Sequence, residues 1–272
     1  MANFKLLEIN MIKAGYIQFH PELGNIDKNI ERLDLFLDKV KDADLIVLPE
    51  LVSTGYNFLS RNDALACAEN INSSRFVDFL NAKAKQHNIN IVAGINEKVE
   101  DKLFNTTVLV GPNGYLGKYQ KIHLFMNEKD IFETGAAGLP VFDLGFAKVA
   151  MLICFDYYFP EIWRIVGMKG ADIVCHSSNL LTQNAHKIVP AQAFMNRLFI
   201  ITSNRIGTER NLTFNGTSFI SDPNGNVLVK ASEDFEEVKI IEFDPLQSRN
   251  KFVTPRNHAF DDRHPDLYNE LI

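Results

Sequence analysis

Three residues that could do chemistry each end a separate stretch of the chain. Cys154 ends a continuous apolar run that starts at residue 147, and residues 155–161 predict a turn that leads into a helix. A thiol at the carboxyl end of a buried strand can face a crevice, where the next main-chain N–H groups and the helix start supply positive potential. Glu50 ends an apolar stretch, and Lys121 ends a stretch of mixed polarity. A thiol, a carboxylate and an ammonium group placed in this way form an acid/base and nucleophile set.

Each of the three residues also has an ordinary structural explanation. A buried cysteine is commonly an inert small hydrophobe, and a thiol with its ordinary pKa of about 8.5 needs a base or a positive field to react at neutral pH. Glu50 could form a salt bridge or cap a helix, because a carboxylate that closes an apolar strand is rarely buried without a partner. Lys121 could be a solvated surface lysine. The chemical interpretation therefore depends on the set as a whole.

The first half of the chain alternates strand and helix patterns and then forms a hairpin. The turn signal Gly-Pro-Asn-Gly at 111–114 predicts that hairpin, because Gly and Asn tolerate positive φ. Apolar residues recur at helical spacing between the expected strands. The expected strands cover residues 12–18, 45–50, 89–94, 107–110 and 115–118, and the expected helices are capped by Asp27 and by Ser73 or Ser74.

The second half repeats this order, with a second Pro-Asn-Gly hairpin at 222–226. We therefore predict an α/β fold, a four-layer αββα sandwich with two pseudo-symmetric halves. Because no linker interrupts the sequence, residues 1–272 are expected to form a single domain with a C-terminal tail from about residue 255. The expected strands of this half are 147–154, 171–176, 198–203, 217–221, 227–230 and 238–243, and the expected helices are 160–168 and 190–197.

The composition narrows the class of protein. The formal net charge is -6 and no block of Lys or Arg stands out, which argues against nucleic acid or an anionic membrane as the main partner. The three cysteines, Cys67, Cys154 and Cys175, lack metal-type or paired spacing, so we expect neither a zinc site nor a disulfide framework. Reduced thiols, the lack of a signal-peptide pattern and the lack of an apolar run of about 18 residues predict a cytoplasmic protein.

Several segments are similar, in order and local sequence, to the three signatures of the nitrilase superfamily of carbon-nitrogen hydrolases. This resemblance covers nearly the whole chain. The signature segments are Pro49-Glu50, residues 118–125 (Lys-Tyr-Gln-Lys-Ile-His-Leu-Phe) and residues 153–161 (Ile-Cys-Phe-Asp-Tyr-Tyr-Phe-Pro-Glu). Further matches are Asn105, Asn179, Asn196-Arg197, 203–207, 214–218 and 263–268.

The resemblance implies a role for each matching residue. Cys154 corresponds to the nucleophile, Glu50 to the general base and Lys121 to the cation that stabilises the tetrahedral intermediate. The family's second glutamate corresponds to Glu128, with Glu133 as the competing choice. The chemistry fits: hydrolysis through a thioester needs a thiolate, a proton donor for departing ammonia and a positive group near the oxyanion. No metal or organic cofactor is required.

The resemblance favours a branch of the family but not a substrate. The residues after the cysteine are Phe155-Asp156, where nitrile-cleaving members usually carry Trp-Glu, so an amidase on a small carboxamide that releases ammonia and a carboxylic acid is preferred. An N-carbamoyl-amine amidohydrolase or a nitrilase are the alternatives on the same site, and a non-catalytic scaffold or regulatory domain is the alternative of another class. The expected substrate-binding residues are Tyr56, Phe155, Tyr157 and Asn179.

The resemblance also implies a homodimer or a higher homo-oligomer. The contact is expected through the helices after Cys154 and around 190–197, with the tail near Tyr268 crossing to the partner subunit. The apolar residues expected on that surface are Phe159, Ile162, Trp163 and Phe194.

Overall fold

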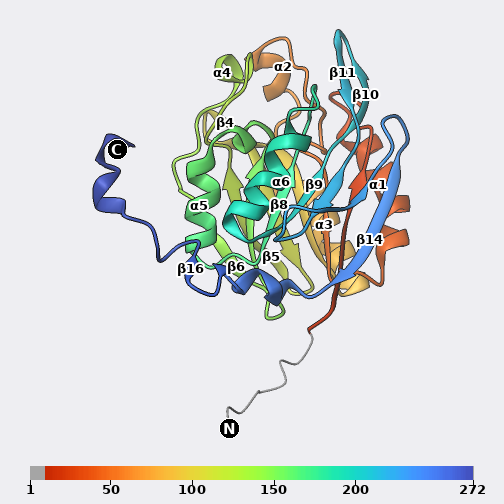
Figure 1. Cartoon of the computed structure of the whole chain (residues 1–272). Coiled ribbons are helices and arrows are strands. Elements are labelled where there is room, and N and C mark those ends of the chain that lie inside the picture. Colours follow the sequence, from red (N-terminus) through yellow and green to blue (C-terminus); the bar gives the residue numbers. More distant parts are fainter. Residues whose placement is uncertain (1–9, 272) are drawn as a thin grey trace.

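The computed structural model describes residues 10–271. Two six-stranded sheets stack face to face, and helices cover the outer face of each (Figure 1). The strand orders are β14-β1-β2-β3-β4-β5 in the first sheet and β13-β12-β9-β8-β7-β6 in the second. The predicted α/β fold with a four-layer αββα arrangement is therefore confirmed.

The first sheet combines parallel strands in its centre with antiparallel strands at its edges. β1, β2 and β3 run parallel, and the hairpin of β4 and β5 continues the sheet on one side. On the other side β14, from the end of the chain, pairs antiparallel with β1. The strands are β1 (Ile12–Gln18), β2 (Leu45–Val47), β3 (Asn90–Val99), β4 (Lys102–Gly111), β5 (Gly114–Gln120) and β14 (Glu237–Phe243), and the covering helices are α1 (Ile26–Leu37) and α3 (Arg75–His87).

The second sheet repeats the parallel centre. β7, β8 and β9 run parallel, while β6 and the β12–β13 hairpin pair antiparallel at the edges. The strands are β6 (Val141–Asp143), β7 (Lys148–Ile153), β8 (Ile173–Ser177), β9 (Phe199–Ser203), β12 (Phe219–Ser221) and β13 (Val227–Lys230), and the covering helices are α5 (Pro160–Met168) and α6 (Ala185–Asn196).

The core explains why the central strands are almost wholly apolar. One cluster fills the space between the sheets and continues under α5 and α6, with Tyr16 and Val47 from the first sheet against Met151 and Ile201 from the second. A second cluster lies between the first sheet and α1 and α3, and includes Leu33 and Leu80. Strands buried on both faces show continuous apolar runs rather than alternation. Because the first cluster joins both sheets, the two halves share one core.

Two helix starts differ from the prediction. Asn25, not Asp27, caps α1, because its side chain accepts from the Lys28 N–H, whereas Ser74 caps α3 as one of the two predicted residues. α6 begins at Ala185, five residues before the predicted start at Pro190. A proline is common at the first helical position, but here it lies inside the helix.

Several short elements were not predicted, and four of them gather at one end of the molecule. Figure 1 shows α2, α4 and the β10–β11 hairpin together at its top, where they surround the site described below. The unpredicted elements are α2 (Arg61–Leu65), α4 (Glu128–Ile131), β6 (Val141–Asp143), β10 (Ile206–Glu209), β11 (Leu212–Asn215), β15 (Phe252–Thr254), β16 (Asn257–His258) and the short 3-10 helices η1 (Asp38–Val40), η2 (Ile71–Ser73), η3 (Cys154–Tyr158), η4 (Pro245–Arg249), η5 (Pro265–Leu267) and η6 (Asn269–Leu271).

The C-terminal tail leaves the body of the molecule beside α5 (Figure 1). It is held at its start by Phe260, whose ring lies 4.8 Å from the Arg164 guanidinium and 5.0 Å from the Lys251 amine. Within residues 10–271, no helix is long and apolar enough to cross a membrane.

The apolar surface of α5 and α6 differs from the one expected for a dimer contact. Ile162 and Trp163 are only 5% and 0% exposed, because both point into the core between α5 and the second sheet. The expectation that these two residues lie on the surface was therefore wrong. Phe159 is half-buried and Phe194 is exposed as expected. The other exposed apolar residues of this face are Tyr158, Ile165, Met168 and Met195.

Candidate active site

The predicted residues meet where the parallel strands of both sheets end. Glu50 lies in the turn three residues beyond the end of β2, and Cys154 follows β7 directly as the first residue of η3. Lys121 follows β5 directly, and Asn179 lies just beyond β8. Carboxyl ends of parallel strands are the usual place for a site in an α/β protein. The first sheet supplies the charged groups, and the second sheet supplies the thiol.

Glu50 is fully buried and tied to two donors. Its Oε1 accepts from Asn105 Nδ2 at 2.7 Å and from Lys121 Nζ at 2.7 Å. Gly94 of β3 makes room for this turn, since a Cβ there would lie 2.6 Å from the Glu50 Cα. Burial raises the pKa of Glu50 to about 7, although the Lys121 charge opposes that rise. The carboxyl group can therefore both take and give a proton near neutral pH.

Lys121 is a buried ammonium held between two carboxylates. Its Nζ lies 2.7 Å from Glu50 Oε1 and 2.8 Å from Glu128 Oε1. Burial lowers the pKa of Lys121, but the charges of Glu128 and Glu50 outweigh that effect and raise it above its ordinary value. The side chain thus keeps its positive charge. Glu133, the competing second glutamate, is exposed, and the contact to Lys121 comes from Glu128.

Cys154 occupies a strained position at the strand-to-helix turn. Its φ of 41° lies in the left-handed region, which a non-glycine residue adopts at a cost of about 1–3 kcal/mol. The side chain is 7% exposed, and burial raises the pKa of the thiol well above its ordinary value. The Glu50 charge raises it further, while Lys121 and the Asn179 main-chain N–H lower it. The resting sulfur is therefore a neutral thiol that needs a base.

Two buried side chains hold the turn that carries the nucleophile. His176 Nε2 lies 2.9 Å from the Cys154 carbonyl oxygen, and because a carbonyl only accepts, this nitrogen carries the proton. Burial lowers the pKa of His176 to about 4, so the ring is neutral at physiological pH. Asp156 accepts from the Ile153 N–H at 2.9 Å and from the Tyr119 hydroxyl at 2.8 Å. Together these bonds fix the chain on both sides of the strained residue.

Tyr56 joins the charged groups to a cavity. Its hydroxyl donates to Glu128 Oε1 at 2.7 Å, the same oxygen that Lys121 contacts. The loop that carries it is anchored by Glu209, whose Oε2 accepts from the N–H groups of Tyr56 at 2.9 Å and Asn57 at 2.8 Å. Glu209 is itself paired with the buried Arg205.

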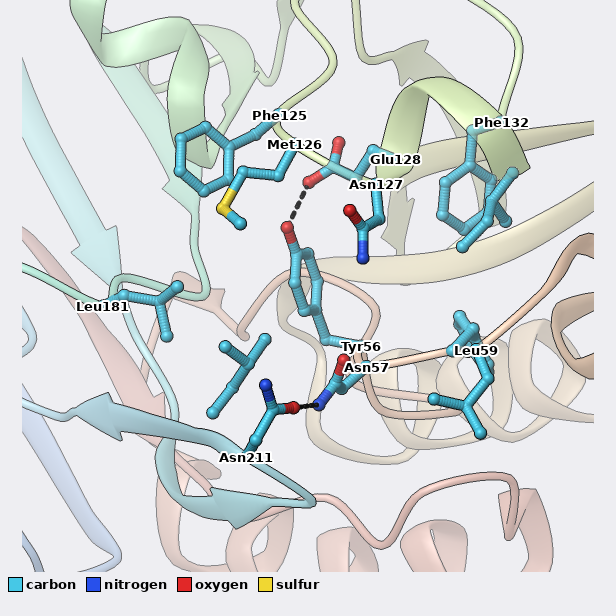
Figure 2. A pocket seen from close by; sticks show the side chains of 13 residues that line it. Tyr56, Asn57, Leu59, Phe125, Met126, Asn127, Glu128, Phe132, Leu181 and Asn211 are labelled. Carbon is cyan, nitrogen blue, oxygen red and sulfur yellow. Dashed lines mark hydrogen bonds between the residues drawn. The ribbon is translucent and has the colours of Figure 1, made fainter.

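The cavity has a volume of about 230 Å³ and lies at the end of the molecule formed by α2, α4 and the β10–β11 hairpin. Figure 2 shows Tyr56 crossing it toward Glu128, with Asn127 on one side and Asn211 on the other. Apolar side chains such as Leu59 and Phe132 form much of its wall. Tyr56 and Glu128 line this cavity, and Glu128 contacts Lys121. We therefore regard it as the candidate substrate pocket.

The four predicted substrate-binding residues lie in different places. Tyr56 lines the cavity. Phe155 is half-buried against Phe125, with ring centres 5.0 Å apart, and Tyr157 is 8% exposed and packs near His176. Asn179 is 3% exposed, and its Nδ2 donates to the Glu50 carbonyl oxygen at 3.0 Å. The structure therefore places Asn179 as a link between the turns that carry the carboxylate and the thiol.

Sequence reasoning assigned no role to several residues that contact this set. Asn105 holds Glu50, and its signal was a polar residue within a buried strand. His176 holds Cys154 and lies at the end of a buried strand, which is the same kind of signal. Glu209 holds the Tyr56 loop, and nothing in its local sequence marks it. Within residues 10–271 no group of three or more His, Cys, Asp or Glu side chains could hold a metal ion.

The fold and the buried set of Glu50, Lys121 and Cys154 point to one class of hydrolase. The chain belongs to the carbon-nitrogen hydrolase family, whose sequence profile matches residues 13–250. The resemblance to the nitrilase superfamily is thus confirmed.

Three known proteins illustrate the similarity. The chain is 42% identical over 260 residues to a protein named nitrilase from Pyrococcus abyssi (strain GE5 / Orsay). The aligned region covers 95% of this chain and 99% of that protein. It is 32% identical to the 2-oxoglutaramate amidase of Bacillus subtilis (strain 168), over 93% and 97% of the two chains. The crystal structure of a carbon-nitrogen hydrolase from Helicobacter pylori G27 superposes with a TM-score of 0.82, at 27% identity and 97% and 99% coverage.

Proposed function

We propose that this protein is a cofactor-free amidase that hydrolyses the C–N bond of a small carboxamide through a thioester on Cys154. The observation that carries the proposal is the Lys121 ammonium, which is completely buried between Glu50 and Glu128 at the turn beside the thiol. A desolvated cation held by two carboxylates is costly to bury for stability alone. It is suited to stabilising an oxyanion that develops next to a nucleophile.

Acylation begins with proton transfer from the Cys154 thiol to Glu50 as the sulfur attacks the amide carbon. The new S–C bond pushes the carbonyl electrons onto oxygen, and this oxyanion faces Lys121 Nζ and the Phe155 N–H. A helix start leaves its first N–H groups without helical partners, so the N–H of Phe155 in η3 suits this role. One such donor contributes about 3–4 kcal/mol to barrier lowering. Glu50 then gives its proton to the nitrogen, the C–N bond breaks, and ammonia leaves.

Deacylation uses the same groups in reverse order. Glu50 takes a proton from a water molecule whose oxygen attacks the thioester carbon, and the oxyanion again faces Lys121. The C–S bond breaks, the carboxylic acid leaves, and the sulfur regains the proton from Glu50. The net reaction consumes one amide and one water and yields one carboxylic acid and one ammonia.

The second glutamate fits a role in positioning. Glu128 Oε1 is occupied by Lys121 and Tyr56, whereas Oε2 is buried without a hydrogen-bond partner among residues 10–271. Glu50 Oε2 is in the same state. Two unpaired acceptor oxygens on either side of one ammonium suit the two N–H bonds of a substrate carboxamide.

Nitrile hydrolysis is the second candidate, and a specific observation favours it. The relative with 42% identity is named nitrilase. The preference for amides rests on Asp156 after Phe155, yet Asp156 binds the Ile153 N–H and Tyr119 rather than the candidate pocket. Substrates of both kinds, together with N-carbamoyl amines, therefore belong in the first assay.

The test compares ammonia release by the wild type and by Cys154→Ala across short amides, N-carbamoyl amines and nitriles. We expect turnover by the wild type and none by the variant, with unchanged thermal melting because the side chain becomes only slightly smaller. Cys67→Ala is the matched control, since Cys67 is half-buried beside α2 and should keep full activity. Iodoacetamide should label Cys154, and a small substrate should block that labelling. An active Cys154→Ala variant would rule out the nucleophile, and an inert thiol with no turnover would favour a scaffold role.

The proposed working form is a cytoplasmic homodimer joined through α5 and α6. This face carries exposed apolar residues, and a groove of about 580 Å³ lies between it and the tail, lined by Ile165, Met168, Met195 and Tyr268 among others. Exposed apolar surface rimmed by polar residues is typical of a protein contact. Sedimentation equilibrium should give twice the chain mass, and a monomer at micromolar concentration would contradict the proposal.

A further inference from the structure

We infer that the substrate's acyl part is short and uncharged, so that the preferred amides end in a neutral group rather than in a carboxylate or an ammonium. This inference rests on the proposed function, because it concerns the same site. It goes beyond that function by naming the substrate class. The observations that carry it are the charges, the polar groups and the size of the cavity beside Glu128.

The cavity offers no cation to a substrate carboxylate. Among the residues that the structure describes, no Lys, Arg or His lines it, and the Lys121 amine is already held by its two carboxylates. The Arg210 guanidinium lies near the rim, but it is engaged elsewhere. Its Nε donates to the Asn57 carbonyl oxygen at 3.1 Å, and its NH2 lies 3.2 Å from Asp63. A carboxylate brought into this space would lose water without gaining a partner.

The cavity also offers little to a substrate ammonium group. Glu128 is the carboxylate that lines it, and one of its oxygens already accepts from Lys121 and Tyr56. The other oxygen is needed by the carboxamide that reacts.

The polar groups that remain are carboxamides. Asn57 is occupied, because its Nδ2 donates to the Glu209 carbonyl oxygen at 2.8 Å and to Asn211 Oδ1 at 3.2 Å. Asn211 and Asn127 approach from opposite sides of Tyr56, as Figure 2 shows. Asn127 does not cap α4 with its side chain. Neutral amides that can both donate and accept suit a neutral hydrogen-bonding group on the substrate.

The size of the cavity limits the acyl chain. Its volume of about 230 Å³ is below the roughly 300–1,000 Å³ of sites for drug-sized ligands. Much of the remaining wall is apolar, with Phe132 and Leu181 among its side chains. A chain of a few carbons with a neutral end fits these properties.

The experiment uses three amides of nearly the same shape. Succinamide ends in a carboxamide, succinamate in a carboxylate, and 4-aminobutyramide in an ammonium group at pH 7.5. We expect kcat/KM for succinamide to exceed that for each charged amide at least 100-fold, because a site without a partner for a buried group rejects it strongly. Succinamate or 4-aminobutyramide turned over as efficiently as succinamide would overturn the inference and leave the proposed function intact. No ammonia from any amide or nitrile would overturn both.

A variant of the pocket gives the reciprocal test. Asn211→Arg adds a cation at the edge of the cavity, and Asn211→Gln is the matched control that keeps a neutral carboxamide. We expect the arginine variant to raise the succinamate-to-succinamide ratio of kcat/KM at least 10-fold and the glutamine variant to leave it within about 3-fold. Equal ratios in both variants would show that charge in this cavity does not select the substrate.

Discussion

Glu50→Gln should remove activity and stabilise the folded chain at the same time. Glutamine has nearly the same shape, so its Oε1 can still accept from Asn105 and Lys121. Its Nε2 would take the place of Oε2, which has no partner within residues 10–271, so the number of unpaired buried atoms does not change. The variant therefore isolates the charge and the proton transfer from the packing.

The size of both effects follows from the buried carboxyl group. Loss of a general base typically slows a reaction about 10²–10⁴-fold. The pKa of Glu50 rises from 4.5 to about 7 on folding, which corresponds to a cost of about 3 kcal/mol for the ionised group. A folded-state pKa above the unfolded value means that Glu50 keeps its proton up to a higher pH in the folded chain than in the unfolded chain. Wild-type stability therefore falls as pH rises from about 4.5 to 7, and the glutamine variant lacks this loss.

The assay measures thermal melting and ammonia release between pH 4.5 and 8.5. We expect the variant to melt higher than the wild type by an increment on the order of 6 °C at pH 8 and at about the same temperature at pH 4.5. Wild-type kcat/KM should rise through an apparent pKa near 7, because Glu50 must be ionised to act as a base. Glu133→Gln, the same change on an exposed side chain, is the control and should alter neither quantity. A Glu50→Gln variant with more than a tenth of wild-type kcat/KM, or one that melts lower at pH 8, would refute the reasoning.

Two further substitutions test how the set is held. Tyr56→Phe removes the hydroxyl that donates to Glu128 at 2.7 Å, and a bond to a charged group contributes about 1.5–3 kcal/mol. We expect kcat/KM to fall about 10- to 100-fold and the melting temperature to fall by a few degrees, and full activity would show that Glu128 needs no second donor. His176→Leu leaves the Cys154 carbonyl oxygen without its donor at 2.9 Å, so kcat should fall about 10-fold at an unchanged KM. His176→Gln can still donate and should restore kcat, whereas equal kcat in the two variants would show that His176 only fills space.

The sequence predicts the layers and three site residues for a physical reason. Alternating strand and helix patterns with continuous apolar strands specify a sheet covered on both faces. In such a sheet, polar residues just beyond apolar strands must lie at an edge. Glu50 and Cys154 follow that rule, although both fall just outside the strands that were expected to contain them. Lys121 follows it at the end of β5.

Other features depend on contacts between distant residues and leave no local signal. Glu128 and Glu133 are the same residue type in the same segment, and only the fold of α4 buries one and exposes the other. Trp163 was expected on the surface because α5 is apolar on more than one face, and packing against the second sheet decides which face is buried. The β10–β11 hairpin was missed because its strands are short and largely polar, although it supplies Glu209 and Asn211 to the site.

The site exists only when the two sheets are packed together, and Asn179 shows why. Its side chain donates to the Glu50 carbonyl oxygen at 3.0 Å, and its main-chain N–H lies close enough to the Cys154 thiol to lower the pKa of that group. One residue beyond β8 thus sets the position of the base on the first sheet relative to the nucleophile on the second. Neither half supplies the whole site by itself, because Glu50, Lys121 and Glu128 come from the first half and Cys154 from the second. A substitution that loosens the apolar contact between the sheets should therefore reduce the rate of thiol deprotonation before it unfolds the chain, since proton transfer requires hydrogen-bond distance while cohesion of the core does not.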